Sequence, residues 1–192
     1  MDYQEIVERR RALVIEPYKS LAEVGFDGPW VTPYQITSKS PEGPVLVALH
    51  WLDESSILTE RATLQHLGYL PTIRFNNVIN TALARLGLSR PDIYVTQTFH
   101  LIPRTRSERI SQTAIRRSFD EVTRFELQGR KVIALGEIAA GECARHDIEH
   151  IAVCHPSRRG SSNEQNASEI AEALAALGFG GVVKDTGTQV DR

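Results

Sequence analysis

The spacing of apolar residues changes along the chain, and each change marks a predicted element. Helical spacing predicts helices over 2–14, 55–67, 76–86, 108–126, 137–145 and 163–177. Short apolar or β-branched runs predict strands at 45–49, 92–96, 131–135 and 150–153. Strands that alternate with helices favour parallel pairing. The expected fold is therefore α/β, a three-layer α/β/α sandwich with a central four-stranded parallel sheet.

The segment before the first strand is harder to place. A helix over 2–14 would use Ile6, Leu13 and Val14 as its apolar positions. Residues 25–44 contain four prolines and are expected to be irregular.

Length and composition indicate one globular domain. The 192 residues fit a single domain, in which 1–44 form an extension and 184–192 a frayed tail. No apolar run reaches the roughly 18 residues of a membrane span, and the N-terminus lacks the apolar stretch of a secretory signal. We expect a cytoplasmic monomer without membrane contact.

Neither a metal nor another cofactor is expected. Cys143 and Cys154 are the only cysteines, too few for a disulfide framework or a four-cysteine site. His146 and His150 are four residues apart, but a strand is predicted to begin there. No P-loop and no Gly-x-Gly-x-x-Gly motif occurs in the chain.

Polar and basic residues gather in the loops that follow the predicted strands. In a parallel sheet these loops, 50–55, 97–106, 136–139 and 155–162, meet at one edge, where ligands bind. The formal net charge is −2, so binding to phosphates would depend on locally clustered arginines. Such a cluster is also compatible with a solvated surface.

Three segments resemble the uracil-DNA glycosylase superfamily, over about two thirds of the chain. Residues 78–103 (VINTALARLGLSRPDIYVTQTFHLIP) resemble its helix, strand and base-reading loop. Residues 131–143 (KVIALGEIAAGEC) resemble its strand, Leu-Gly turn and alanine-rich helix. Residues 153–157 (VCHPS) resemble its second active-site motif, in which a strand runs into His-Pro-Ser. The resemblance implies a uracil-DNA glycosylase-like fold and a DNA partner.

The resemblance implies roles for the residues around His-Pro-Ser. Hydrolysis of an N-glycosidic bond places negative charge on the departing base, and the base must first leave the stack. His155 would stabilise that base. Ser157 would contact a phosphate, and Arg158 and Arg159 would lie in the loop that enters the groove. Arg104 and Arg106 are further DNA-contact candidates. His155 is also compatible with a structural histidine at a strand end.

The first motif departs from the family pattern of Gly-x-x-Pro with a water-holding residue. This chain has His50-Trp51-Leu52-Asp53-Glu54 in its place. Asp53 is the first candidate for holding water, with His50 and Glu54 as substitutes. Each acid is equally compatible with a helix start, where acids are favoured.

The base-reading position departs as well. The family places an asparagine there, and this chain has Gln97, which offers the same amide on a longer side chain. Tyr69 and Phe75 are candidates for stacking on the base, and both are compatible with ordinary core packing.

Together these residues predict a monofunctional DNA glycosylase that leaves an abasic site. The altered motifs favour a modified pyrimidine, such as a hydroxymethylated or glucosylated cytosine of phage DNA, and thus antiviral defence. Two alternatives stay open. One is ordinary uracil excision in base-excision repair, and the other is a catalytically inactive DNA-binding relative.

Overall fold

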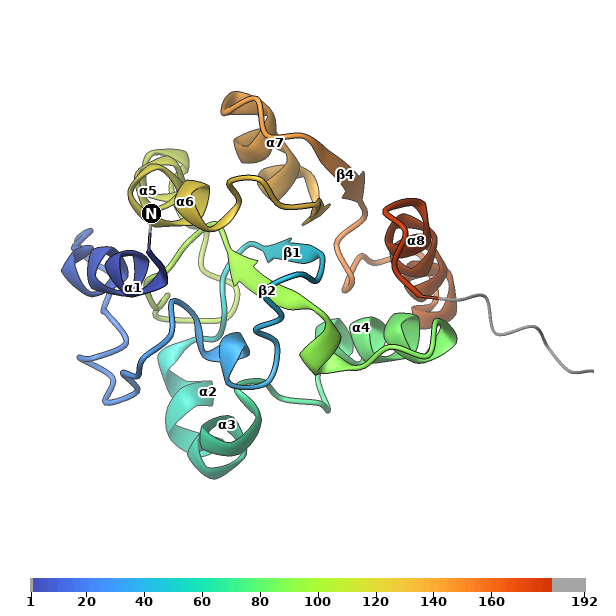
Figure 1. Cartoon of the computed structure of the whole chain (residues 1–192). Helices are drawn as coiled ribbons and strands as arrows, with labels where there is room; N and C mark the ends of the chain where they lie inside the picture. The colour runs from blue at the N-terminus through green and yellow to red at the C-terminus, as the bar shows by residue number, and fades with distance from the viewer. Residues whose placement is uncertain (1, 181–192) are drawn as a thin grey trace, which may run out of the picture.

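A four-stranded, all-parallel sheet forms the centre of the computed structural model, which describes residues 2–180 (Figure 1). The strands are β1 (Val45–Ala48), β2 (Tyr94–Gln97), β3 (Val132–Leu135) and β4 (His150–Val153), in the order β2-β1-β3-β4. In the register, Val47 lies opposite Thr96 on β2 and Ala134 on β3. The predicted four-stranded parallel sheet is confirmed.

Helices follow the predicted segments, with shifted ends. The α-helices are α1 (Tyr3–Ala12), α2 (Glu54–Thr59), α3 (Arg61–Leu67), α4 (Arg74–Arg85), α5 (Gln112–Ser118), α6 (Arg124–Glu126), α7 (Glu137–Arg145) and α8 (Asn163–Ala176). Two 3₁₀ turns, η1 (Pro33–Ile36) and η2 (Arg90–Asp92), precede β1 and β2, and a π-helical turn, η3 (Phe119–Thr123), joins α5 to α6. The predictions for 137–145 and 150–153 match the observed bounds.

Two predicted helices and one predicted strand differ from the observed elements in where they begin or in whether they are continuous. The segment 55–67 is interrupted at Glu60, whose backbone leaves helical geometry between α2 and α3. The segment 108–126 becomes helical only at Gln112, because the Ser111 side chain accepts from the Ala114 N–H and caps α5. The second strand starts at Tyr94 because η2 occupies the residues just before it.

Alternate residues of β1, β2 and β3 supply two separate cores, one on each face of the sheet, which makes the three layers. Leu46, Val95 and Ile133 pack with α4 and α8 on one face. On the opposite face the neighbouring residues, among them Val47 and Ala134, pack with η3 and α7. This alternation follows from the pleat of a strand, which sends successive side chains to opposite faces. The result is an α/β/α sandwich.

The N-terminal extension packs against the sheet domain, because Leu13 shares a buried cluster with Phe99 and Val122. Arg10 is almost fully buried, and its guanidinium donates to the Asp27 carboxylate (2.6 Å) and the Trp30 carbonyl (2.7 Å). Leu13 is buried as expected, whereas Val14 is 61% exposed because the helix has ended by that residue. Residues 25–44 are irregular except for η1. The predicted tail at 184–192 lies outside the described residues.

No helix within residues 2–180 has the length and apolar character needed to cross a membrane.

Candidate functional site

The loops after the four strands meet at one edge of the sheet, as the sequence predicted. All four strands are parallel, so Ala48, Gln97, Leu135 and Val153 end at the same edge. Hydrogen bonds fix two of the loops there: the Thr98 N–H donates to the Ala48 carbonyl, and the Gly136 N–H donates to the Val153 carbonyl.

His155 lies two residues beyond the end of β4, half-buried at this edge. Its Nδ1 accepts from the Ser157 N–H at 3.1 Å. Burial lowers the pKa of His155, so the imidazole is neutral at physiological pH. Because Nδ1 is an acceptor, the single ring proton sits on Nε2. His155 therefore presents Nε2–H as a hydrogen-bond donor.

Two neighbours position the His155 ring. The Phe75 ring lies 5.5 Å from it, centroid to centroid. On the other side Gly136 has φ of +100°, and a Cβ built there would come 3.3 Å from the His155 Cβ. A larger residue at 136 would be strained and would crowd the imidazole. The glycine of the Leu-Gly turn is thus explained by the approach of His155.

His50 lies at the start of the loop after β1, within electrostatic range of His155. Burial lowers the pKa of His50, and the nearby His155 and Arg106 side chains lower it further, while the Asp53 carboxylate and a hydrogen bond with the Trp51 backbone act in the opposite direction. These couplings place the four side chains in one neighbourhood. Within residues 2–180 the buried His50 Nδ1 has no hydrogen-bond partner. A second neutral imidazole, with a buried Nδ1 that lacks a partner among the described residues, therefore lies within electrostatic range of the first.

Asp53 and Glu54 are both engaged in local structure. Asp53 is buried at the N-cap of α2, where one carboxylate oxygen accepts from the Ser56 N–H and the other from the Ser56 hydroxyl, each at 3.0 Å. Glu54 forms an ion pair with Lys19 at 2.7 Å. The contacts of Asp53 correspond to the helix-start interpretation, whereas the contact of Glu54 is an ion pair with Lys19.

The three base-binding candidates contact different neighbours in the structure. Gln97 is buried at the end of β2, and its side-chain oxygen accepts from the Thr32 hydroxyl at 3.4 Å. Phe75 contacts His155, as described above. Tyr69 instead lies under the Arg90 guanidinium, 4.0 Å from its ring centroid. The structure thus brings Phe75 to the His155 edge and assigns Tyr69 to a buried cation–π pair.

The arginine candidates differ in how far they are already paired. Arg158 bonds to Glu169 at 3.1 Å and contacts the Cys154 thiol. Arg104 is held by Glu108, whose pKa it lowers through two hydrogen bonds. Arg106 and Arg159 are exposed. Among the described residues, Arg106 and Arg159 therefore lack the carboxylate partner that Arg104 and Arg158 have.

The sequence did not predict a buried polar network centred on Glu126, next to the end of β2. Glu126 is fully buried and accepts hydrogen bonds from the Tyr94 hydroxyl, the Thr96 hydroxyl and the Gln35 amide (2.9 Å). Burial raises the pKa of Glu126 to about 7, against those three hydrogen bonds, which lower it. No spacing could have indicated this cluster, because its members come from three distant segments.

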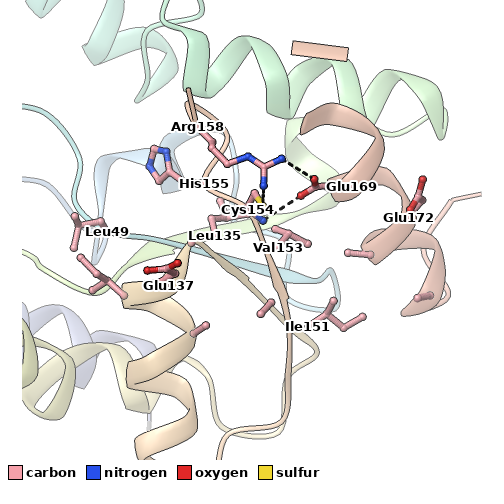
Figure 2. Close-up of a pocket in the computed structure, with 16 residues that line it drawn as sticks. Leu49, Leu135, Glu137, Ile151, Val153, Cys154, His155, Arg158, Glu169 and Glu172 are labelled. Atoms are coloured by element: carbon pink, nitrogen blue, oxygen red, sulfur yellow. Dashed lines mark hydrogen bonds and ion pairs between the residues drawn. The ribbon is translucent and has the colours of Figure 1, made fainter. Parts of the chain in front are cut away.

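A cavity of about 1000 Å³ opens along β4, between α7 and α8 (Figure 2). His155, Leu49 and Gly136 line it, and in Figure 2 it extends from His155 and Leu49 past Val153 to Ile151. Gln97, Phe75 and Tyr69 do not line it. The cavity and the proposed base-reading side chains therefore share only the His155 edge.

No protein-family model matches the chain, and no curated protein matches it either. Among residues 2–180 no three His, Cys, Asp or Glu side chains gather closely enough to hold a metal ion.

Proposed function

We propose that this protein is a monofunctional DNA glycosylase, which hydrolyses an N-glycosidic bond and leaves an abasic site. The observation that carries the proposal is the state of His155, a neutral imidazole whose Nδ1 is occupied by the Ser157 N–H. Its Nε2–H can then donate to an oxygen of the departing base as negative charge develops there. The His-Pro-Ser segment that resembles the glycosylase superfamily supplies this histidine.

We assign the water-holding role to His50 in preference to Asp53. Both oxygens of Asp53 already accept from Ser56, whereas the His50 Nδ1 has no partner within the described residues. A neutral imidazole nitrogen can accept a proton from the attacking water, whose oxygen bonds to the sugar carbon as the base leaves with the bonding electrons. The nearby Asp53 charge would stabilise the imidazolium that forms.

Phe75 and Gln97 are the residues we propose to contact the base. Phe75 is already against His155, so a base held by His155 would lie within reach of its ring. Gln97 is buried, so reading a base would require it to exchange its Thr32 contact. Because its amide reaches further than the asparagine of the family, we propose a modified pyrimidine as the target, in defence against phage DNA.

DNA would approach across the same edge. Arg106 and Arg159 are exposed, and Ser157 lies two residues after His155. Arg158 would have to exchange its ion pair with Glu169 to contact a phosphate. Arginine–phosphate contacts would hold the strand while the base is flipped. Arg104 contributes less in this proposal, since Glu108 already neutralises it.

An inactive DNA-binding relative is the second candidate, and one observation favours it. Asp53, the sequence's first choice for holding water, caps a helix. A relative that lost catalysis would keep such a cap and the basic edge.

Single-turnover assays on matched duplexes test the proposal. The duplexes carry uracil, 5-hydroxymethylcytosine or its glucosylated form, and excision is measured as alkali-labile sites. We expect excision of a modified cytosine, and a loss of about 10²–10³-fold in His155→Ala with DNA binding retained. His66→Ala, an exposed histidine on α3, is the matched control.

The other outcomes of these assays distinguish the alternatives. Efficient excision of uracil alone would indicate ordinary uracil excision in base-excision repair. DNA binding without excision of any base would favour the inactive relative. An unchanged rate in His155→Ala would remove His155 from the mechanism.

A further inference from the structure

The outer edge of β4 is open, unlike the other three strands. Every residue of β1, β2 and β3 is buried, whereas Ala152 is exposed and Ile151 and Val153 are only half-buried. The Val153 carbonyl accepts from the Gly136 N–H on the β3 side. Since peptide groups of successive strand residues point to opposite sides, those of Ala152 point outward. An open strand edge is a template for pairing with another strand.

The cavity described above runs along this edge and is here called the β4 groove. Ile151, Ala152 and Val153 form its floor, and α7 and α8 form its walls (Figure 2). Ile138 on α7, which is 38% exposed, and Ala176 on α8 line it with apolar surface. Its floor is therefore a strand edge, and its walls suit apolar side chains.

Charge around the β4 groove limits what can occupy it. Glu137, Glu169 and Glu172 line it, against one arginine, Arg158, which is already paired with Glu169. This excess of acid disfavours phosphates and favours lysine or arginine. A second copy of the chain is also disfavoured, because a two-fold axis would bring the glutamates of the two copies together.

The fold disfavours a parallel strand from the same chain. α7 connects β3 to β4 on one face of the sheet, and α8 packs on the opposite face. A strand after α8 that paired outside β4 would need a left-handed crossover, which is rare in parallel sheets. The crossover rule thus favours a strand from another molecule over a parallel strand of this chain.

We infer that the β4 groove is a docking site for an extended segment of a partner protein. The segment adds a strand to β4 through the Ala152 peptide group, places apolar side chains on the groove surface and presents basic side chains to Glu137 and Glu172. This inference does not depend on the proposed glycosylase activity.

Peptide binding to the full-length chain tests it. The probe is a short blocked peptide in which valine and lysine alternate, and the control peptide has glutamate in place of lysine. Binding is measured by fluorescence anisotropy, and hydrogen exchange of the Ala152 amide is followed by NMR. We expect saturable binding of the lysine peptide, slower Ala152 exchange in the complex, and binding of the glutamate peptide weaker by about tenfold or more.

A charge reversal supplies the matched variants. Glu172→Lys changes an exposed residue of α8 and should weaken binding of the lysine peptide several-fold. Glu42→Lys, an exposed glutamate outside the groove, should leave binding unchanged.

Four results would overturn the inference. They are absence of saturable binding, equal binding of the two peptides, equal effects of the two variants, or slow exchange of the Ala152 amide before any peptide is added. The last would show that the chain itself, or a second copy, already covers β4, and light scattering would separate those two.

Discussion

Replacing the buried Glu126 by glutamine should remove a pH dependence from the stability of this protein. Glu126→Gln keeps the shape of the side chain and an oxygen that can still accept from Tyr94 and Gln35. The new amide would face the Thr96 hydroxyl, to which it can donate. Only the ability to ionise is lost, so the variant isolates the cost of a buried carboxylate.

The magnitude follows from the pKa of Glu126, which burial raises from its ordinary 4.5 to about 7. Each pKa unit corresponds to about 1.4 kcal/mol, so ionisation costs the folded state about 3 kcal/mol. Because folding raises the pKa, protonated Glu126 contributes the full amount of about 3 kcal/mol to the free energy of unfolding below pH 4.5. The contribution is lost as the pH rises through about 7. His100, 3.8 Å from Glu126, stays neutral in this window, since burial lowers its pKa to about 3.

Urea unfolding of both proteins at several pH values measures this effect. The free energy of unfolding of Glu126→Gln minus that of the wild type should be smallest below pH 4.5 and should grow by about 3 kcal/mol towards pH 8. Groups common to both proteins cancel in this difference. A difference that stays flat, or that falls as the pH rises, would refute the reasoning about Glu126.

Three further predictions concern the His155 edge. Excision should fall much more in His50→Ala than in Asp53→Ser, which keeps the α2 cap, and single-turnover rates that rank the other way would restore the water-holding role to Asp53. Arg106→Ala should make the slope of log affinity against log salt shallower by about one unit, and Arg104→Ala should change it less, because Glu108 already pairs with Arg104. Equal slopes for the two variants in DNA titrations would contradict this. Gly136→Ala should lower the free energy of unfolding by about 1–3 kcal/mol and slow excision, because φ of +100° is strained for alanine and its Cβ crowds His155. A melting temperature equal to that of the wild type would argue against this account.

The pattern of the sequence was sufficient to predict the layered fold. Continuous apolar runs such as 45–49 are typical of strands that two helical layers cover, and the observed β1 is buried at every residue. Parallel pairing then required all four loops to meet at one edge, so the neighbourhood of His155 was predictable as well. Both inferences depend on local pattern and on connection rules, which a single sequence contains.

The roles of individual side chains at that edge depended on tertiary contacts. An acid before a helix looks the same in sequence whether it holds water or caps the helix, and only the bonds to Ser56 assign Asp53 to the cap. Phe75 and Tyr69 are both buried aromatics, but one packs on His155 and the other under Arg90. Burial alone cannot distinguish them, because it is common to core and pocket.

Non-local pairing decided the remaining features. Glu126 is a polar residue at a helix end, ordinarily a solvated position, and it is buried because Tyr94, Thr96 and Gln35 converge on it from distant segments. The run 150–153 predicted a strand but not its place in the sheet. Strand order depends on which strands pair through backbone hydrogen bonds. Only the folded structure therefore places β4 at the edge of the sheet, where the groove lies.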